Sequence, residues 1–363
     1  MFIAGIISEA LLYCCFSLLL GSFILSLIPK TARPEIKIPK GVLLGAALGI
    51  AIFSFLPVLK IVLYLYEDLG LGYTLKSVLT NFEVGKTWIS TGIISLILFI
   101  YLIPIKLEQK PLFSITGIAF TLILIASLGW SSHAASLSKW SGFITHSAHF
   151  LAITTWVGIL LVVSWFSRNH DHWLNFLKWF SPVAVLCLVT TTITGISLMT
   201  YHMSLTDYVN VTAISYGQTL LIKHLAILPL LVFAFVNSFL IRKRLKNDPS
   251  YNPLPWAKLE SVIVLIVFSI TGALGQVSPP HELSRMIFAE GASKLFTFFH
   301  PGAIEFPFDF SPGIVSISLF LISLLFLALV IVTFIKKAPK VLAIVMSLLF
   351  ILSGYIGFML SIS

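Results

Sequence analysis

Charged residues are scarce in this sequence. Only 10% of its 363 residues are charged, whereas 58% are hydrophobic and the mean hydropathy is +1.02. This composition excludes a water-soluble globular protein. The short stretches of alternating polarity that transmembrane strands require are also missing. Apolar runs of roughly 20 residues recur instead between short polar breaks, so we expect an all-α, polytopic transmembrane helix bundle.

The sequence also has few cysteines and no nucleotide-binding motif. The three cysteines, Cys14, Cys15 and Cys187, fall inside apolar segments, which argues against an extracytoplasmic disulfide framework. No Walker motif is present, so any transport must follow a gradient, the membrane potential or a partner protein. The net charge of +9 comes from basic residues in short loops, where they orient helices. We therefore expect the lipid bilayer as a partner and no nucleic acid.

Hydropathy predicts ten spans with a clear charge asymmetry between the loops. The predicted spans are about 3–28, 41–64, 87–105, 112–130, 143–166, 178–200, 218–241, 259–277, 312–335 and 339–361. With the N-terminus outside, every inner loop is basic and the outer loops hold few lysines or arginines. We therefore expect both termini to be extracytoplasmic in a multi-pass protein of a bacterial-type plasma membrane. No convincing cleavage site follows the first span, which we expect to stay as an anchor.

The chain separates into four blocks of different character. Residues 1–130 form a four-helix section with few candidate ligands, and residues 131–281 carry most of the histidines. Residues 282–311 form most of the longest loop, whose apolar residues suit a short amphipathic helix on the outer membrane surface. Residues 312–363 form an apolar hairpin of two helices.

The most informative stretch is Phe143–Ser167, a membrane-length apolar run that contains His146 and His149. Residues three apart in a helix leave from the same face, so the two imidazoles are expected to point together. Polar, metal-capable side chains inside a membrane span are costly and indicate a functional site. We therefore interpret this pair as a metal or cofactor site in the fifth span.

Further candidate ligands lie on the same predicted side of the membrane. The outer histidines are His133, His146, His149, His202, His224, His281 and His300. Met199 and Met203 flank His202 at the end of the sixth span. Imidazole suits several transition metals and thioether favours copper(I), so this combination points first to copper. Packing or helix-to-helix hydrogen bonding stays open for His224 and the methionines, and simple solvation stays open for His133, His281 and His300.

The same region resembles a known family. The stretches HSAHFLAITTWVG (146–158), FSPVAVLCLVTTTITG (180–195) and YGQTLLIKH (216–224), then Asn237, Glu260 and Pro279–Pro280, follow in order the short motifs of the copper resistance protein D (CopD) family. The resemblance covers about residues 143–280. It implies a polytopic plasma-membrane protein that moves copper inward from the extracytoplasmic side. No CopC-like copper-binding domain precedes the first span here, so a separate extracytoplasmic CopC-like donor or capture of free copper is expected.

We therefore expect copper transport, most naturally import, and copper homeostasis rather than an enzymatic reaction. Copper, as Cu⁺ or Cu²⁺, is expected to be captured by His133 or the 278–311 loop and bound among the site residues. These are His146, His149, His202 and His224, with Met199 and Met203 as softer ligands and His133 and His281 at the entrance.

Two alternatives stay open. A b-type haem oxidoreductase would use His146 or His149 with His224 as axial ligands, because helix bundles commonly hold haem between facing helices. A membrane partner in oxidase assembly or copper delivery would bind copper without moving it.

Overall fold

The protein is helical throughout its described part. The computed structural model describes residues 1–104, 111–280, 283, 287, 291–302 and 306–363. These residues contain no strand, and extended pairing is limited to two isolated β-bridges, Ile36 with Ser167 and Phe310 with Ile362. Ten helices of the described chain are long and apolar enough to cross a membrane. The prediction of an all-α protein with about ten spans is therefore confirmed, and the side on which the termini lie stays a prediction.

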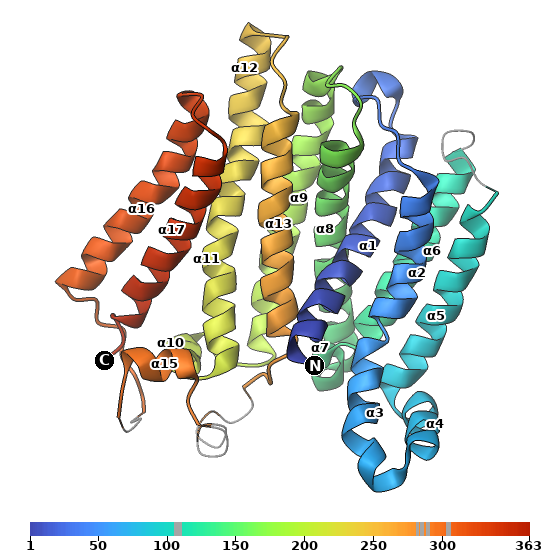
Figure 1. Ribbon diagram of the computed structural model, residues 1–363, viewed down its shortest axis with the longest axis vertical. Helices are drawn as coiled ribbons and strands as arrows, with labels where there is room; N and C mark the ends of the chain where they lie inside the picture. Colours follow the sequence, from blue (N-terminus) through green and yellow to red (C-terminus); the bar gives the residue numbers. More distant parts are fainter. Residues whose placement is uncertain (105–110, 281–282, 284–286, 288–290, 303–305) are drawn as a thin grey trace. The chain divides into compact units, whose positions relative to one another are not determined.

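Contacts divide the chain into two compact units, Met1–Tyr201 and His202–Ser363. The described part of the first unit contains nine α-helices and a 3-10 turn, and Figure 1 shows their arrangement. They are α1 (Phe2–Leu27), η1 (Lys30–Ala32), α2 (Lys40–Phe53), α3 (Leu56–Leu69), α4 (Leu71–Asn81), α5 (Glu83–Leu102), α6 (Pro111–Trp130), α7 (His133–Leu137), α8 (Lys139–Phe166) and α9 (Trp173–Thr200). The four blocks drawn from composition stay a prediction.

Helix α1 is the centre of the first unit. It packs against α2, α6 and α8, and its Phe16, Leu19 and Phe23 are fully buried. Helix α8 approaches α1 so closely that a Cβ added at Gly158 would lie 2.2 Å from the carbonyl oxygen of Ser17. Small residues allow such backbone approach in membrane proteins, where packing replaces the hydrophobic effect as the source of helix association. The crossing fixes α8, which carries His146 and His149.

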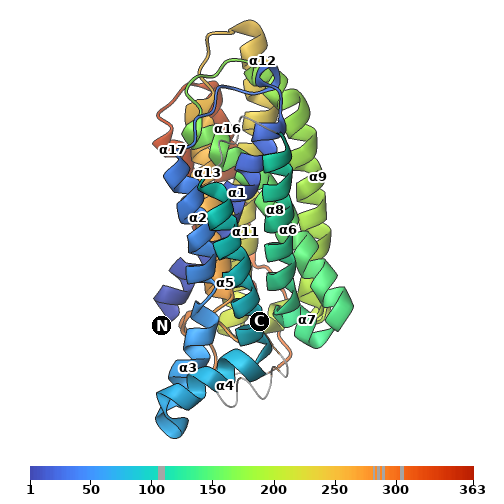
Figure 2. The same ribbon diagram turned by 90° about the vertical axis from the view of Figure 1, so that its right-hand side faces the viewer.

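The second span, predicted over residues 41–64, is divided into two helices in the structure. Helix α2 ends at Phe53, and α3 begins at Leu56 with Pro57 in its first turn. Gly70, with φ of 77°, then turns the chain into α4, a helix that the hydropathy profile did not predict. Figure 2 shows α3 and α4 beyond the lower end of α2. Proline is favoured at helix starts and glycine at left-handed positions, so both boundaries follow from residue type.

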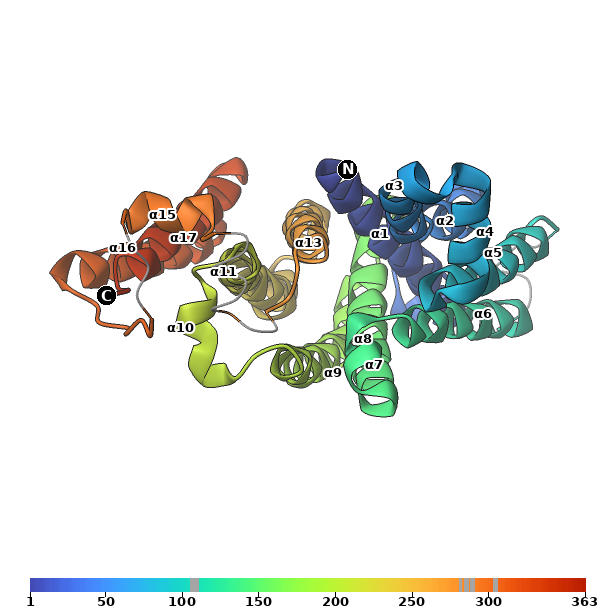
Figure 3. The ribbon, with the colours of Figure 1, turned by 90° about the horizontal axis from the view of Figure 1, so that it is seen from below.

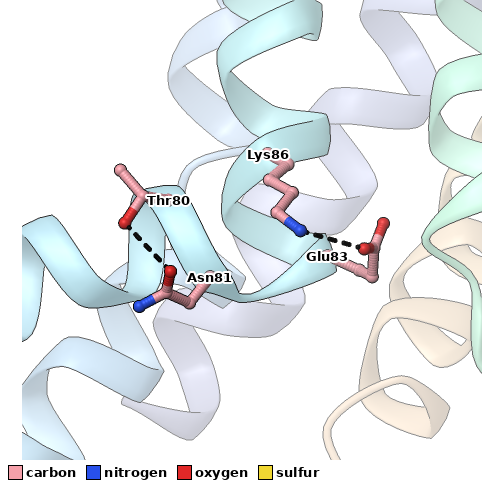
Figure 4. A network of polar contacts seen from close by, with 4 residues as sticks. All are labelled: Thr80, Asn81, Glu83 and Lys86. Carbon is pink, nitrogen blue, oxygen red and sulfur yellow. Dashed lines mark hydrogen bonds and ion pairs between the residues drawn. The ribbon is translucent and has the colours of Figure 1, made fainter.

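The junction between α4 and α5 is polar and exposed (Figure 4). Lys86 forms an ion pair with Glu83 at 3.3 Å, and the Thr80 hydroxyl lies 3.4 Å from the side-chain oxygen of Asn81. Exposed pairs of this kind contribute about 0–1 kcal/mol. The junction therefore stabilises the fold little.

Two basic loops of the first unit pack together. The amide of Lys37 donates to the carbonyl of Phe166 at 3.0 Å, and the amide of Arg168 donates to the carbonyl of Glu35 at 2.8 Å. The indole of Trp179 also donates to the carbonyl of Ala32 at 2.9 Å. The loop after α1 and the loop after α8 thus share one end of the unit, as their common basic character led us to expect.

Where the structure describes it, the second unit contains four long helices and several short elements. They are η2 (Leu205–Asp207), α10 (Tyr208–Val211), α11 (Ser215–Phe235), the π-helical segment η3 (Val236–Leu240), α12 (Ile241–Asn247), α13 (Leu254–Leu274), α15 (Lys294–Phe299), α16 (Ile314–Ile335) and α17 (Val341–Met359). Helices α16 and α17 pack side by side as a hairpin, and α15 lies across the end of α17 (Figure 3).

The structure describes part of the loop over residues 282–311, which was predicted to hold a short amphipathic helix. Much of residues 281–290 and residues 303–305 lie outside the described residues. Within the described part, α15 buries Phe296 completely, against a cluster that includes Ala213, Tyr355 and Met359. The short helix is therefore held to the unit by a buried aromatic side chain on its inner face.

Candidate functional site

His149 is fixed in the first unit by a hydroxyl of the neighbouring helix. Its Nδ1 lies 2.9 Å from Oγ1 of Thr194 on α9. The Thr194 hydroxyl donates its one hydrogen to the carbonyl of Thr190, at 2.6 Å, so it accepts a hydrogen bond from the imidazole. The proton of the neutral ring therefore sits on Nδ1 and the lone pair on Nε2. Metal-binding histidines are commonly oriented in this way by a group that bonds the other ring nitrogen.

Gly195 provides the room for this arrangement. A Cβ added there would lie 3.2 Å from Cε1 of His149, tighter than most such contacts. Thr194 and Gly195 are the last two residues of the family-like stretch 180–195. Both have a local structural role, because Thr194 orients the ring of His149 and Gly195 leaves space beside it.

His146 lies one turn earlier on α8 in different surroundings. Its ring is stacked on Phe150, with centroids 6.5 Å apart, and interacts electrostatically with His133, the exposed first residue of α7. Its Nδ1 is buried and has no hydrogen-bond partner among the described residues. Phe150 in turn contacts Tyr13 of α1, whose hydroxyl donates to Glu9. His146 is therefore grouped with His133 at one end of the unit.

The second unit holds a cavity lined by two of the predicted ligands. His202 and Met203 line a cavity of about 530 Å³ together with Asp207 and Asn210. Met203 is buried, with 8% of its surface exposed, whereas Asp207 is exposed. The cavity is completed by Ser204, Val211, Pro280, Leu283, Phe306 and Pro307. Imidazole, thioether and carboxylate groups thus meet at one hollow, which suits a transition-metal cation.

Tyr208 links this end of the unit to His224. The Tyr208 hydroxyl lies 2.8 Å from Nδ1 of His224, and the two rings stack with centroids 5.7 Å apart. Burial raises the pKa of Tyr208, so this hydroxyl stays protonated at neutral pH. As with His149, a hydroxyl on Nδ1 orients the ring.

The remaining predicted residues are placed as follows. Met199 lies in the last turn of α9, in the first unit, and His281 lies outside the described residues. His300 hydrogen-bonds through Nε2 to the carbonyl of Met359 at 2.9 Å, which gives it a structural partner. Cys187 is buried and bonds the backbone of Trp156.

The predicted convergence of the imidazoles of His146, His149, His202 and His224 stays a prediction, because two of them lie in each unit. Over the described ranges, no three His, Cys, Asp or Glu side chains form a group that could hold a metal ion. Within the first unit, His146 interacts electrostatically with His133, and within the second unit, His202 and Met203 line one cavity. Asp207, Tyr208 and Asn210 were missed because their signal, a polar run after His202, also fits an ordinary loop.

Comparisons of the sequence with known proteins identify one family. A family model described as "Copper resistance protein D" matches residues 174–274, and "Copper resistance protein D-like, N-terminal domain" matches residues 3–143. The chain belongs to the copper resistance protein D family. The CopD match covers the helices that carry Thr194, Met199 and His224, and the N-terminal match covers α1 to the start of α8. The predicted family resemblance is therefore confirmed and extends over a longer part of the chain.

A curated relative agrees with this assignment. "Inner membrane protein YebZ" of Escherichia coli (strain K12) is 24% identical over 211 residues, which cover 54% of this chain and 69% of the relative. No solved structure matches the chain. With ten apolar spans among its described residues, this CopD-family chain is a multi-pass plasma-membrane protein associated with copper resistance or transport in general. The haem alternative receives no support from these comparisons.

Proposed function

We propose that this CopD-family protein transports copper across the plasma membrane, and that it does so inward. The observation that carries the proposal is the cavity of the second unit, where His202, Met203 and Asp207 face one hollow. We infer that the transported metal is copper from family membership, since both family models are named for copper resistance. The cavity supplies ligands that suit it, because thioether and imidazole favour copper.

The open character of the site agrees with transport. A permeating ion must bind strongly enough to enter and weakly enough to leave. His202 and Met203 offer a small number of ligands next to an exposed carboxylate, Asp207, which attracts cations. His149 of the first unit and His224 of the second, each oriented through Nδ1 by a hydroxyl, are further proposed ligands.

Charge within the second unit supports the inward direction. The cavity residues His202, Met203 and Asp207 come shortly before Ser215, the start of α11, whereas α12 at the far end of the same continuous helix carries four basic residues. These are Arg242, Lys243, Arg244 and Lys246. Basic ends of membrane helices face the cytoplasm, so the cavity is proposed to face outward. Inward movement of a monovalent cation then gains about 2.3 kcal/mol per 100 mV of inside-negative potential, without nucleotide hydrolysis.

The test is copper uptake by purified protein in liposomes that contain a trapped copper-sensitive dye. We expect the double substitution His202→Ala with Met203→Leu to abolish most of the initial uptake rate. His170→Ala, which removes a histidine from the loop after α8 in the other unit, is the matched control and is expected to keep it. Loss in both variants, or in neither, would contradict the cavity as the loading site.

The same preparation separates transport from copper delivery. Stoichiometric copper binding by wild-type protein without any flux would overturn the transport proposal and favour a role as a membrane partner. A Soret band in the visible spectrum of the purified protein would instead revive the haem alternative.

A further inference from the structure

A second polar site lies inside the membrane-spanning part of the second unit. Glu260 of α13 is buried, with 3% of its surface exposed, and Asn237 of the η3 segment is buried beside it, with 8% exposed. The carboxamide Nδ2 of Asn237 donates to Oε2 of Glu260 at 2.6 Å and to the carbonyl of Trp256 at 3.2 Å. Neither residue belongs to the copper cavity.

Among the described residues, no cation is paired with this carboxyl. Glu260 bonds the neutral amide of Asn237, and Lys258, on the same helix, is exposed. The guanidinium of Arg244 lies over the ring of Tyr251, 4.0 Å from its centroid. Lys223 precedes Asn237 by fourteen residues along α11 and η3, which is about 21 Å of helix. The other titratable side chains of the elements packed on α13 are Tyr216 and His224 in α11 and Arg242, Lys243 and Lys246 in α12, and α16 has none.

An ionised Glu260 carboxylate in this buried position would be unfavourable in free energy. Burial of an ion without a counter-ion or a full set of hydrogen bonds is strongly unfavourable. The neutral acid avoids this cost, and a partner for its O–H is at hand: Oδ1 of Asn237 is buried and has no hydrogen-bond partner among the described residues. Oδ1 and Nδ2 of one carboxamide thus offer an acceptor for the protonated carboxyl and a donor for the ionised one.

The backbone at Asn237 is unusual. Residues Val236–Leu240 form a π-helical turn inside an otherwise α-helical span. Single π-turns are uncommon and occur frequently at functional sites, because the extra residue weakens the regular hydrogen-bond ladder. Asn237 therefore sits on a π-turn, and Glu260 sits on the regular helix α13, which packs against α11.

The position suits coupling to the copper cavity. Asn237 follows Ser215, the residue at the cavity end of α11, by 22 residues. At 1.5 Å per residue the two sites are about 33 Å apart along one helix. The carboxyl thus lies toward the basic end of the unit, where an ion that entered at the cavity would leave.

We propose that Glu260 and Asn237 form a proton-binding site that is loaded and unloaded during transport, so that copper movement is coupled to proton movement. The proposal rests on the transport function proposed above. If the carboxyl were only structural, a permanently neutral glutamine would replace it without consequence. Oxygen ligands of a carboxyl and an amide are hard and suit a proton better than soft copper(I).

The first test uses the uptake assay with an imposed pH gradient and the membrane potential clamped at zero. A difference of one pH unit biases each coupled proton by about tenfold. Copper uptake by the wild type is expected to respond severalfold to the gradient. Glu260→Gln, which keeps the shape and the Asn237 contact, is expected to lose the response, and the exposed Glu83→Gln is expected to keep it. Equal responses in wild type and Glu260→Gln would overturn the proposal.

The second test does not depend on copper. Difference infrared spectroscopy of the wild type should show a protonated-carboxyl band that changes with bulk pH, that is absent in Glu260→Gln and that is present in Glu9→Gln. If the glutamine variant does not fold, Asn237→Ala must shift the band. A band seen without any copper flux would keep the proton site and reject the transport proposal. A band that is absent, or that never responds to pH, would overturn the proton site.

Discussion

The contact between α1 and α8 allows a sharp test of the fold that carries the histidine pair. Gly158→Ala adds a Cβ that would lie 2.2 Å from the carbonyl oxygen of Ser17 and 3.0 Å from the amide nitrogen of Gly21. Real Cβ atoms essentially never approach another atom closer than 3.0 Å, so the shortfall at Ser17 is 0.8 Å. All the opposing atoms belong to the backbone and cannot rotate away. The two helices must therefore separate.

The size of the effect follows from this geometry. Overpacking a well-packed interface costs about 1–3 kcal/mol. Because rigid backbone opposes the new methyl group, we expect the upper half of this range, reduced by the better helix propensity of alanine, at most about 1 kcal/mol. Separation of α1 from α8 would also disturb the edge-to-face contact of Phe150 with Phe16, whose ring centroids are 5.1 Å apart. The change thus propagates toward His146.

The assay is reversible unfolding in mixed detergent micelles, followed by tryptophan fluorescence. Gly45→Ala is the matched control, because no atom lies within 4 Å of an added Cβ at this position in α2. The control should be neutral or stabilised by up to about 1 kcal/mol. If Gly158→Ala proved as stable as Gly45→Ala, the close crossing of α1 and α8 would be refuted.

Three other outcomes can be checked directly. Tyr208→Phe removes the hydroxyl that orients His224, so equilibrium copper affinity should fall by about 10–100-fold, and unchanged affinity would argue against His224 as a ligand. A hydrogen bond from Ser141 lowers the pKa of Tyr201, so Ser141→Ala should raise that pKa and move phenolate absorbance to higher pH; a shift in the opposite sense would contradict the contact. Phe296→Ala should destabilise the second unit by about 3–5 kcal/mol in the same unfolding assay, because the ring is fully buried, and a loss below 1 kcal/mol would place α15 on the surface.

The fold was largely predictable because the membrane restricts it. A span must satisfy its own backbone hydrogen bonds, so apolar runs of sufficient length become helices almost regardless of detail. The missed α3–α4 hairpin shows the limit of this argument. Hydropathy continues through Phe53. The break after Phe53 depends on Pro57, and the turn from α3 into α4 depends on Gly70; both effects are local and do not alter mean hydropathy.

Sequence patterns propose candidate ligands by residue type, but they do not indicate which side chains surround each candidate. Helical spacing placed His146 and His149 on one face, yet each ring has its own surroundings, Thr194 for one and Phe150 for the other. Spacing along one helix carries no information about which neighbouring helix supplies a partner. The same limit hid Tyr208, which reaches a ring sixteen positions away in the sequence.

The oxidation state of the transported copper can be argued from ligand softness. Thioether favours soft monovalent metals, whereas imidazole accepts both monovalent and divalent ones. If Cu⁺ is the substrate, Met203→Leu should weaken binding of Ag⁺, a soft monovalent substitute, much more than binding of Zn²⁺, whereas His202→Ala should weaken both. Equal losses for the two metals in Met203→Leu would show that the thioether only packs in the cavity wall. Such a packing role is consistent with the burial of Met203, which has 8% of its surface exposed. Isothermal titration with each metal therefore decides between a Cu⁺ site and a general imidazole site.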